Sequence, residues 1–135
     1  MISLFDTIRE LNLPADDFAI FGSGPLIVRG IVPVSNDLDV ICRGRAWEQV
    51  KALGEIRYLT EYDVNIVSMN DGYLTFGTEW GIGDFDTNEL IDSAEEIDGL
   101  HFVRLEHVAA YKKISRRPKD LDHLDALRAY RNEHK

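Results

Sequence analysis

The spacing of apolar residues along the chain alternates between the helical and the strand period, which is typical of an α/β fold. Helical spacing is found at residues 2–12, 46–53, 87–95 and 105–114 and from Pro118 onward, with a shorter helix ending at Gly30. Strand-like apolar runs lie at residues 18–21, 37–42, 56–60, 64–69, 73–78 and 100–103. We therefore expect a single domain over residues 1–135, with a small mixed, twisted sheet flanked by helices.

Polar residues between these segments predict where elements begin and end. Ser3 and Thr87 precede apolar helical patterns and are expected to cap two helices. Asn70-Asp71-Gly72 predicts a hairpin turn between the strands at 64–69 and 73–78. Glu95 and Glu96 are expected to form a solvated acidic face at the end of the helix over 87–95.

Composition fits a globular, intracellular protein. Hydrophobic residues make up 44% of the 135 positions, which allows a genuine core. The single cysteine, Cys42, lies in an apolar strand and is expected to be buried and inert. No run approaches the ~20 apolar residues that span a membrane, and the N-terminus lacks a basic segment typical of secretion signals. We expect a cytoplasmic protein.

The charge of the chain is unevenly distributed. The net charge is −9, yet residues 104–119 hold six of the 15 Lys and Arg residues and only one acid, Glu106. An acidic protein does not offer the broad basic surface of a general nucleic-acid binder. One compact basic segment instead favours contact with a phosphate group. Nucleic acid is therefore expected only as the acceptor of a reaction.

Two aspartates and a glycine-rich turn form the most specific pattern. Asp37 and Asp39 are two apart on a predicted strand, so they project to the same side, and the apolar residues between and after them face the core. Two adjacent carboxylates repel each other unless a cation or a proton lies between them. Gly22-Ser23-Gly24 offers consecutive backbone amides, a good receptor for an anion. Together they indicate a site for magnesium and a nucleotide, although each part alone also occurs as plain turn or surface structure.

This pattern, an apolar-Gly-Ser run followed by Asp-x-Asp among apolar residues, resembles the signature of the nucleotidyltransferase superfamily typified by DNA polymerase beta. The C-terminal run from Lys112 through Arg117-Pro118-Lys119-Asp120 looks like the ending of its minimal and antibiotic-type members. The alternative interpretation of that run is a basic helix end with a salt-bridged turn.

The resemblance implies a nucleotidyltransferase-like fold and a role for each motif. Gly22, Ser23 and Gly24 would bind the triphosphate of an NTP (ATP or GTP), and Asp37 and Asp39 would hold Mg²⁺. Lys112, or its neighbour Lys113, would close over the nucleotide together with Arg117 or Lys119.

The family also has a third carboxylate, on a later strand, and two residues of this chain compete for that role. Asp63 lies two positions before Asn65, which occupies the place of the family's carboxylate. Glu79 is the other candidate, sharing a strand face with Thr75. Either would complete the metal site or deprotonate the acceptor.

Two functions follow from these expectations. The first is transfer of a nucleoside monophosphate from an NTP to a hydroxyl on a small molecule or a protein. The second is a catalytically degenerate module, for instance an antitoxin-like subunit of a toxin–antitoxin pair. The resemblance further implies a separate helical partner protein or a homodimer.

Overall fold

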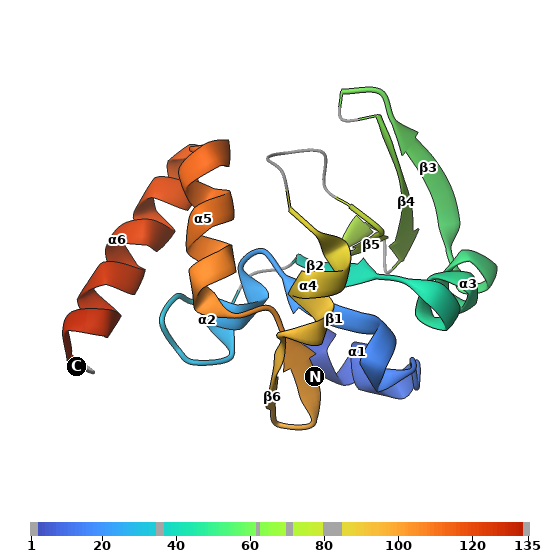
Figure 1. Cartoon of the computed structure of the whole chain (residues 1–135), viewed down its shortest axis with the longest axis horizontal. Helices are drawn as coiled ribbons and strands as arrows, with labels where there is room; N and C mark the ends of the chain where they lie inside the picture. Colours follow the sequence, from blue (N-terminus) through green and yellow to red (C-terminus); the bar gives the residue numbers. More distant parts are fainter. Residues whose placement is uncertain (1–2, 35–36, 62, 70–71, 80–84, 134–135) are drawn as a thin grey trace.

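The computed structural model describes residues 3–34, 37–61, 63–69, 72–79 and 85–133 (Figure 1). The strands are β1 (Phe18–Phe21), β2 (Leu38–Cys42), β3 (Glu55–Leu59), β4 (Val64–Met69), β5 (Leu74–Gly77), β6 (Glu95–Ile97) and β7 (Leu100–Phe102). The helices are α1 (Leu4–Glu10), α2 (Gly24–Ile27), α3 (Gly44–Leu53), α4 (Thr87–Asp92), α5 (Leu105–Ser115) and α6 (Pro118–Glu133), with a 3-10 turn, η1, at Ala15–Asp17. The α/β class is confirmed.

The described strands form one mixed sheet in the order β3-β4-β5-β2-β1-β7-β6. β1 runs antiparallel to β2 and parallel to β7, and β2 runs parallel to β5. β3–β4, β4–β5 and β6–β7 are antiparallel pairs. With seven strands, the sheet is larger than the small sheet that we expected from the sequence.

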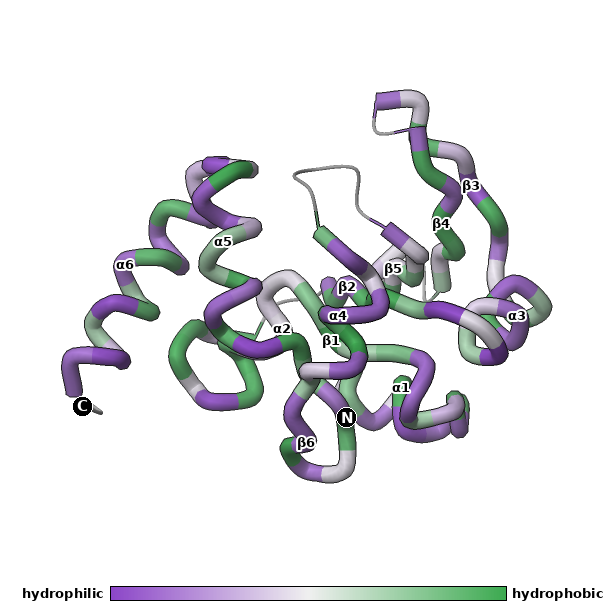
Figure 2. The backbone as a smooth tube through the Cα atoms, viewed as in Figure 1, coloured by the Kyte–Doolittle hydropathy of each residue, from purple (hydrophilic) through white to green (hydrophobic). Residues whose placement is uncertain are grey.

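Helices cover both faces of the sheet because its central strands are apolar on both sides (Figures 1 and 2). On one face, Phe102 of β7 packs edge-on against Phe5 of α1, with 5.6 Å between the ring centroids. On the other face, Phe21 of β1 packs against Tyr111 of α5 at 4.9 Å. All four residues of β1 are buried, so this strand lies in the middle of the core.

Several expected boundaries are confirmed. The Ser3 hydroxyl accepts a hydrogen bond from the Asp6 amide and caps α1. Pro118 is the first residue of α6, where its fixed φ suits a helix start. Cys42 is fully buried, and burial raises the pKa of its thiol to about 12, so the thiol is inert. Asn70 and Asp71 of the expected hairpin turn lie outside the described residues.

The segment over residues 86–97 differs from the expectation. Asp86, not Thr87, caps α4: its carboxylate accepts from the amides of Asn88 and Glu89. The Thr87 hydroxyl donates instead to the carbonyl of Thr78 at 2.5 Å. The helix ends at Asp92, and residues 95–97 form β6 rather than a solvated helical face, because they find backbone partners on β7.

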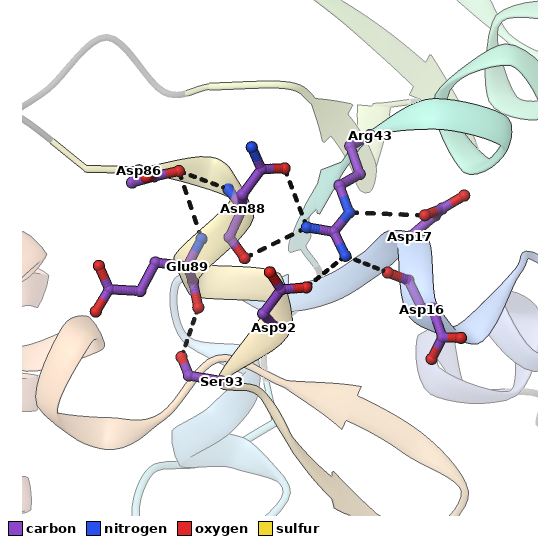
Figure 3. Close-up of polar contacts among 8 residues, drawn as sticks. All are labelled: Asp16, Asp17, Arg43, Asp86, Asn88, Glu89, Asp92 and Ser93. Carbon is purple, nitrogen blue, oxygen red and sulfur yellow. Dashed lines mark hydrogen bonds and ion pairs between the residues drawn. The ribbon is translucent and has the colours of Figure 1, made fainter.

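Arg43 links α4 to η1, the turn that precedes β1 (Figure 3). Arg43 follows β2, and its guanidinium donates to the side-chain oxygen of Asn88 at 3.0 Å and to the carboxylate of Asp92 at 2.6 Å. It also donates to the carbonyl of Asp16 at 2.8 Å and lies 3.6 Å from the carboxylate of Asp17. Arg43 therefore joins α4, η1 and β2.

No helix built from the described residues has the length and apolarity to cross a bilayer.

Candidate functional site

The glycine-rich turn lies directly against the acidic pair. Phe21, the last residue of β1, is paired with Asp39 of β2, so the turn that follows Phe21 passes over the Asp39 side chain. Gly22 has φ +63, and a Cβ built on it would lie only 3.0 Å from Oδ2 of Asp39. The position needs glycine for both reasons. The predicted neighbourhood of Gly22 and Asp39 is therefore present in the fold.

Asp37 and Asp39 differ in exposure, and the charge of Asp37 affects the pKa of Asp39. Leu38 and Val40 are buried, Asp37 is exposed and Asp39 is partly buried, as strand alternation predicts. Burial, and then the charge of Asp37, raise the pKa of Asp39 to about 6, although Lys119, Arg117 and Lys112 act in the opposite sense. Repulsion between the two carboxylates is therefore the second cause of the raised pKa of Asp39, after burial.

Ser23 connects the turn to the C-terminal helices. Its hydroxyl lies 3.5 Å from Nζ of Lys112 on α5 and 3.3 Å from Nδ1 of His123 on α6. These residues are 89 and 100 positions away in the chain. The fold therefore brings the predicted phosphate turn and the predicted lysine together. His123 was not predicted, because a single histidine on a helix carries no spacing signal.

A buried ion pair holds Lys112 in place. Lys112 is 1% exposed and Asp120 is 0% exposed, and Nζ lies 3.2 Å from Oδ1 of Asp120. Burial alone would raise the pKa of Asp120, but hydrogen bonds from Arg117, Ser115 and Lys112 lower it well below its usual value. Burial lowers the pKa of Lys112, against the pull of Asp120. We assign both groups as charged, because a carboxylate with three donors around it keeps its ammonium partner protonated.

The turn between α5 and α6 faces the acidic pair. Arg116 ends α5 in the left-handed conformation, φ 49 and ψ 31, which reverses the chain. Nε of Arg117 donates to Asp120 at 2.9 Å. Nζ of Lys119 lies 3.8 Å from the carboxylate of Asp37, and both side chains are about half exposed. Lys112, Arg117 and Lys119 therefore all act on Asp39 from one side.

Asp63 lies at the other end of its strand from the acidic pair. Asp39 is paired with Thr75 of β5, and Thr75 is paired with Ser68 of β4. Asp63 comes five residues before Ser68, which is about 17 Å at ~3.4 Å per residue. Its carboxylate accepts a hydrogen bond from the hydroxyl of Tyr58. The structure does not bring Asp63 to Asp39.

Asn65 and Glu79 are also placed away from Asp39. Asn65 is three positions from Ser68, so it projects from the sheet face opposite to Asp39. Glu79 follows Thr75 by four positions, about 13 Å at ~3.3 Å per residue, beyond the end of β5. On the β5 side of Asp39, the residues in the same row and on the same face are instead Thr75 of β5 and then Ser68 of β4.

The donor set at the acidic pair suits magnesium, as far as the described residues go. Within them, no group of three or more His, Cys, Asp or Glu side chains could hold a metal ion. Magnesium, however, is commonly held by one or two carboxylates together with the phosphates of its nucleotide. Asp37 and Asp39 supply two hard oxygen ligands. Burial and then the charge of Asp37 raise the pKa of Asp39, and a cation between the two carboxylates would offset their mutual repulsion.

A cavity of about 700 Å³ lies between α5 and α6, apart from the acidic pair. Lys113, Arg116, Arg128 and Arg131 line it, over a floor of alanine and leucine side chains. Of the predicted cations, Lys113 lines this cavity, whereas Lys112, Arg117 and Lys119 do not. Lys113, the alternative to Lys112, therefore faces away from Ser23.

Comparisons of this chain with protein-family models, with curated proteins and with solved structures found no match. The motifs and their arrangement in space are thus the whole basis for assigning a function.

Proposed function

We propose that this chain binds the triphosphate of an NTP with magnesium and transfers its nucleoside monophosphate to a hydroxyl of an acceptor, as nucleotidyltransferases do. One observation carries the proposal. Three motifs far apart in the sequence meet at one place: the Ser23 turn, the carboxylate of Asp39 and the buried ammonium of Lys112. A buried lysine aimed at a serine hydroxyl beside a glycine turn is an arrangement that a phosphate group would complete.

Each residue has a distinct task in this proposal. The backbone of Gly22 to Gly24 and the Ser23 hydroxyl bind the β and γ phosphates. The buried ammonium of Lys112 offsets the negative charge of the phosphates. Asp120 keeps Lys112 charged and directed at Ser23. Arg117 and Lys119 add positive charge on the solvent side of the site.

The proposed reaction is a substitution at the α phosphorus. The acceptor oxygen forms a new bond to the α phosphorus, the bond from this phosphorus to the bridging oxygen breaks, and pyrophosphate leaves with that electron pair. The acceptor proton passes to water. A magnesium ion held by Asp37 and Asp39 would supply charge neutralisation for the triphosphate. The protein mainly positions the groups, which is the general pattern of phosphoryl-type transfer.

Calorimetry with ATP and GTP, each with magnesium, tests the binding part of the proposal. Asp37→Asn and Lys112→Met are expected to weaken binding at least about tenfold, since each removes a charged ligand. Glu79→Gln serves as the control acid and should bind like the wild type. Unchanged affinity in Asp37→Asn would contradict the metal site.

A labelled NTP tests the transfer part. The purified protein is incubated with α-³²P-labelled ATP or GTP, magnesium and a cell extract, and labelled products are separated. A labelled product that disappears with Asp39→Ala supports transfer.

The second candidate is a nucleotide-binding module that does not catalyse transfer. It is favoured by the row beside Asp39, where Thr75 and Ser68 stand in place of a third carboxylate. A hydroxyl cannot act as a base near neutral pH. Magnesium-dependent binding without any labelled product, together with a partner protein that co-purifies, would favour this candidate over the enzyme.

A further inference from the structure

Among the residues that the structure describes, His123 is a titratable side chain in contact with the Ser23 hydroxyl that the proposed roles leave unused. It lies three positions after Asp120, one turn further along α6, so both project toward Ser23 and Lys112. The ring is partly buried, and its Nδ1 lies 3.3 Å from Oγ of Ser23.

The number of protons available around Ser23 limits its hydrogen bonds. A serine hydroxyl has one proton to donate and two lone pairs to accept with. Nζ of Lys112 donates to one lone pair. If Nδ1 of a neutral His123 accepts the hydroxyl proton, Ser23 has no proton left for a phosphate oxygen. If the ring is protonated, Nδ1–H donates to the second lone pair and the hydroxyl proton is released for the anion.

The surroundings of His123 make the neutral ring the resting form. Burial lowers the pKa of His123, and the nearby ammonium groups of Lys112 on α5 and Lys119 on α6 lower it further. Asp120 and Asp122, both on α6, act in the opposite direction but do not prevail. A phosphate chain bound at Ser23 would reverse this balance, because it neutralises the two lysines and adds negative charge beside the ring.

We propose that His123 is a positioning residue of the phosphate site that takes up a proton when a triphosphate binds and thereby turns the Ser23 hydroxyl toward the anion. The inference rests on the proposed function, since it requires a phosphate at Ser23. It makes triphosphate affinity depend on pH: protonation of His123 strengthens binding, so affinity relative to a variant that cannot titrate rises as the pH falls toward the pKa of the ring.

Calorimetry with inorganic tripolyphosphate and magnesium chloride tests the inference without a nucleotide base. Titrations at about pH 7, in two buffers of different ionisation enthalpy, give the number of protons taken up on binding. The wild type should take up roughly 0.3–0.8 proton more than His123→Asn. The asparagine side chain reaches the same place as Nδ1 and keeps a hydrogen bond to Ser23, but it does not titrate.

The pH profile gives a second readout. From about pH 8 to about pH 6, the affinity of the wild type relative to His123→Asn should rise at least about threefold. His101→Asn, on β7 beside Glu96, is the matched histidine control and should behave as the wild type. The midpoint of urea unfolding is measured for each variant before it is titrated, and a midpoint equal to that of the wild type shows that the variant is folded.

The outcomes separate the inference from the proposed function. Binding with the same proton uptake and pH profile in the wild type and His123→Asn overturns the inference and leaves the phosphate site standing. No binding of tripolyphosphate to the folded wild type overturns both.

Discussion

Asp39 is destabilising in its ionised form, and this sets a pH dependence for the folded protein. Its pKa is raised to about 6 by burial and by Asp37, whereas an unfolded aspartate titrates near about 4. A raised pKa gives stability that is full below the unfolded value and is lost as the pH rises to about 6. The stability curve should therefore decline over this window.

We expect Asp39→Asn to be more stable than the wild type by about 1–3 kcal/mol at about pH 7, with the difference vanishing near about pH 4. The same variant should lose magnesium-dependent nucleotide binding. Urea unfolding at both pH values measures the difference. A variant that is less stable than the wild type at neutral pH would show that the Asp39 carboxylate is satisfied within the fold.

The buried pair of Lys112 and Asp120 should behave as a unit. Asp120→Ala leaves the ammonium of Lys112 buried without its anion, and we expect a loss of about 3–5 kcal/mol. Lys112→Met combined with Asp120→Ala should cost clearly less than the sum of the two single changes. Chemical denaturation of the four proteins gives the coupling directly, and additive losses would mean that the two charges do not interact.

At the scale of elements, the attachment of α4 depends on the planar fork of Arg43. Arg43→Lys keeps the charge but cannot reach Asn88, Asp92 and Asp16 at once, so we expect a loss of about 1–2 kcal/mol. Hydrogen exchange in α4 should accelerate in the same variant. Arg45→Lys, at an exposed neighbouring position, is the matched control and should change neither quantity.

Periodicity predicts best the elements whose own residues carry a clear apolar pattern or a helix-start signal. β1, β4 and the start of α6 lie where the sequence places them. β6 was not predicted, since Glu95 and Glu96 favour a helix by propensity and only pairing with β7 makes them extended. Likewise, the sequence does not decide which of two adjacent residues caps a helix. In the structure the carboxylate of Asp86, rather than the hydroxyl of Thr87, accepts from two amides of α4.

The candidate site was predictable as far as local spacing determines it. Two aspartates on alternating positions share a side whatever the sheet order is, so Asp37 and Asp39 could be identified from the sequence. Which residues would occupy the place of a third carboxylate could not be predicted, because this depends on the register between β2, β5 and β4. That register puts Thr75 and Ser68 beside Asp39 and sends Asp63 to the far end of β4.

At the scale of the whole molecule, the proposed phosphate site joins the turn after the central strand β1 to the two C-terminal helices α5 and α6. Ser23 contacts α5 and α6, and Phe21 packs on Tyr111. Binding at Ser23 should therefore protect two distant segments together.

Hydrogen exchange with and without magnesium tripolyphosphate tests this coupling. We expect amides of residues 22–27 and 112–123 to become protected in parallel, with a similar gain in opening free energy, while β3 and β4 stay unchanged. Protection confined to the β3–β4 hairpin would place the ligand elsewhere.

The contact between Lys112 and Ser23 has a consequence for how the protein is made. During synthesis, the turn at Ser23 and the pair Asp37 and Asp39 leave the ribosome well before α5, and Asp120, which holds Lys112, follows later still. A nascent chain can therefore carry the acidic pair while it still lacks the lysine of the proposed phosphate site. α6 supplies Asp120, the partner of Lys112, so the proposed phosphate site is complete only after α6 has folded onto the rest.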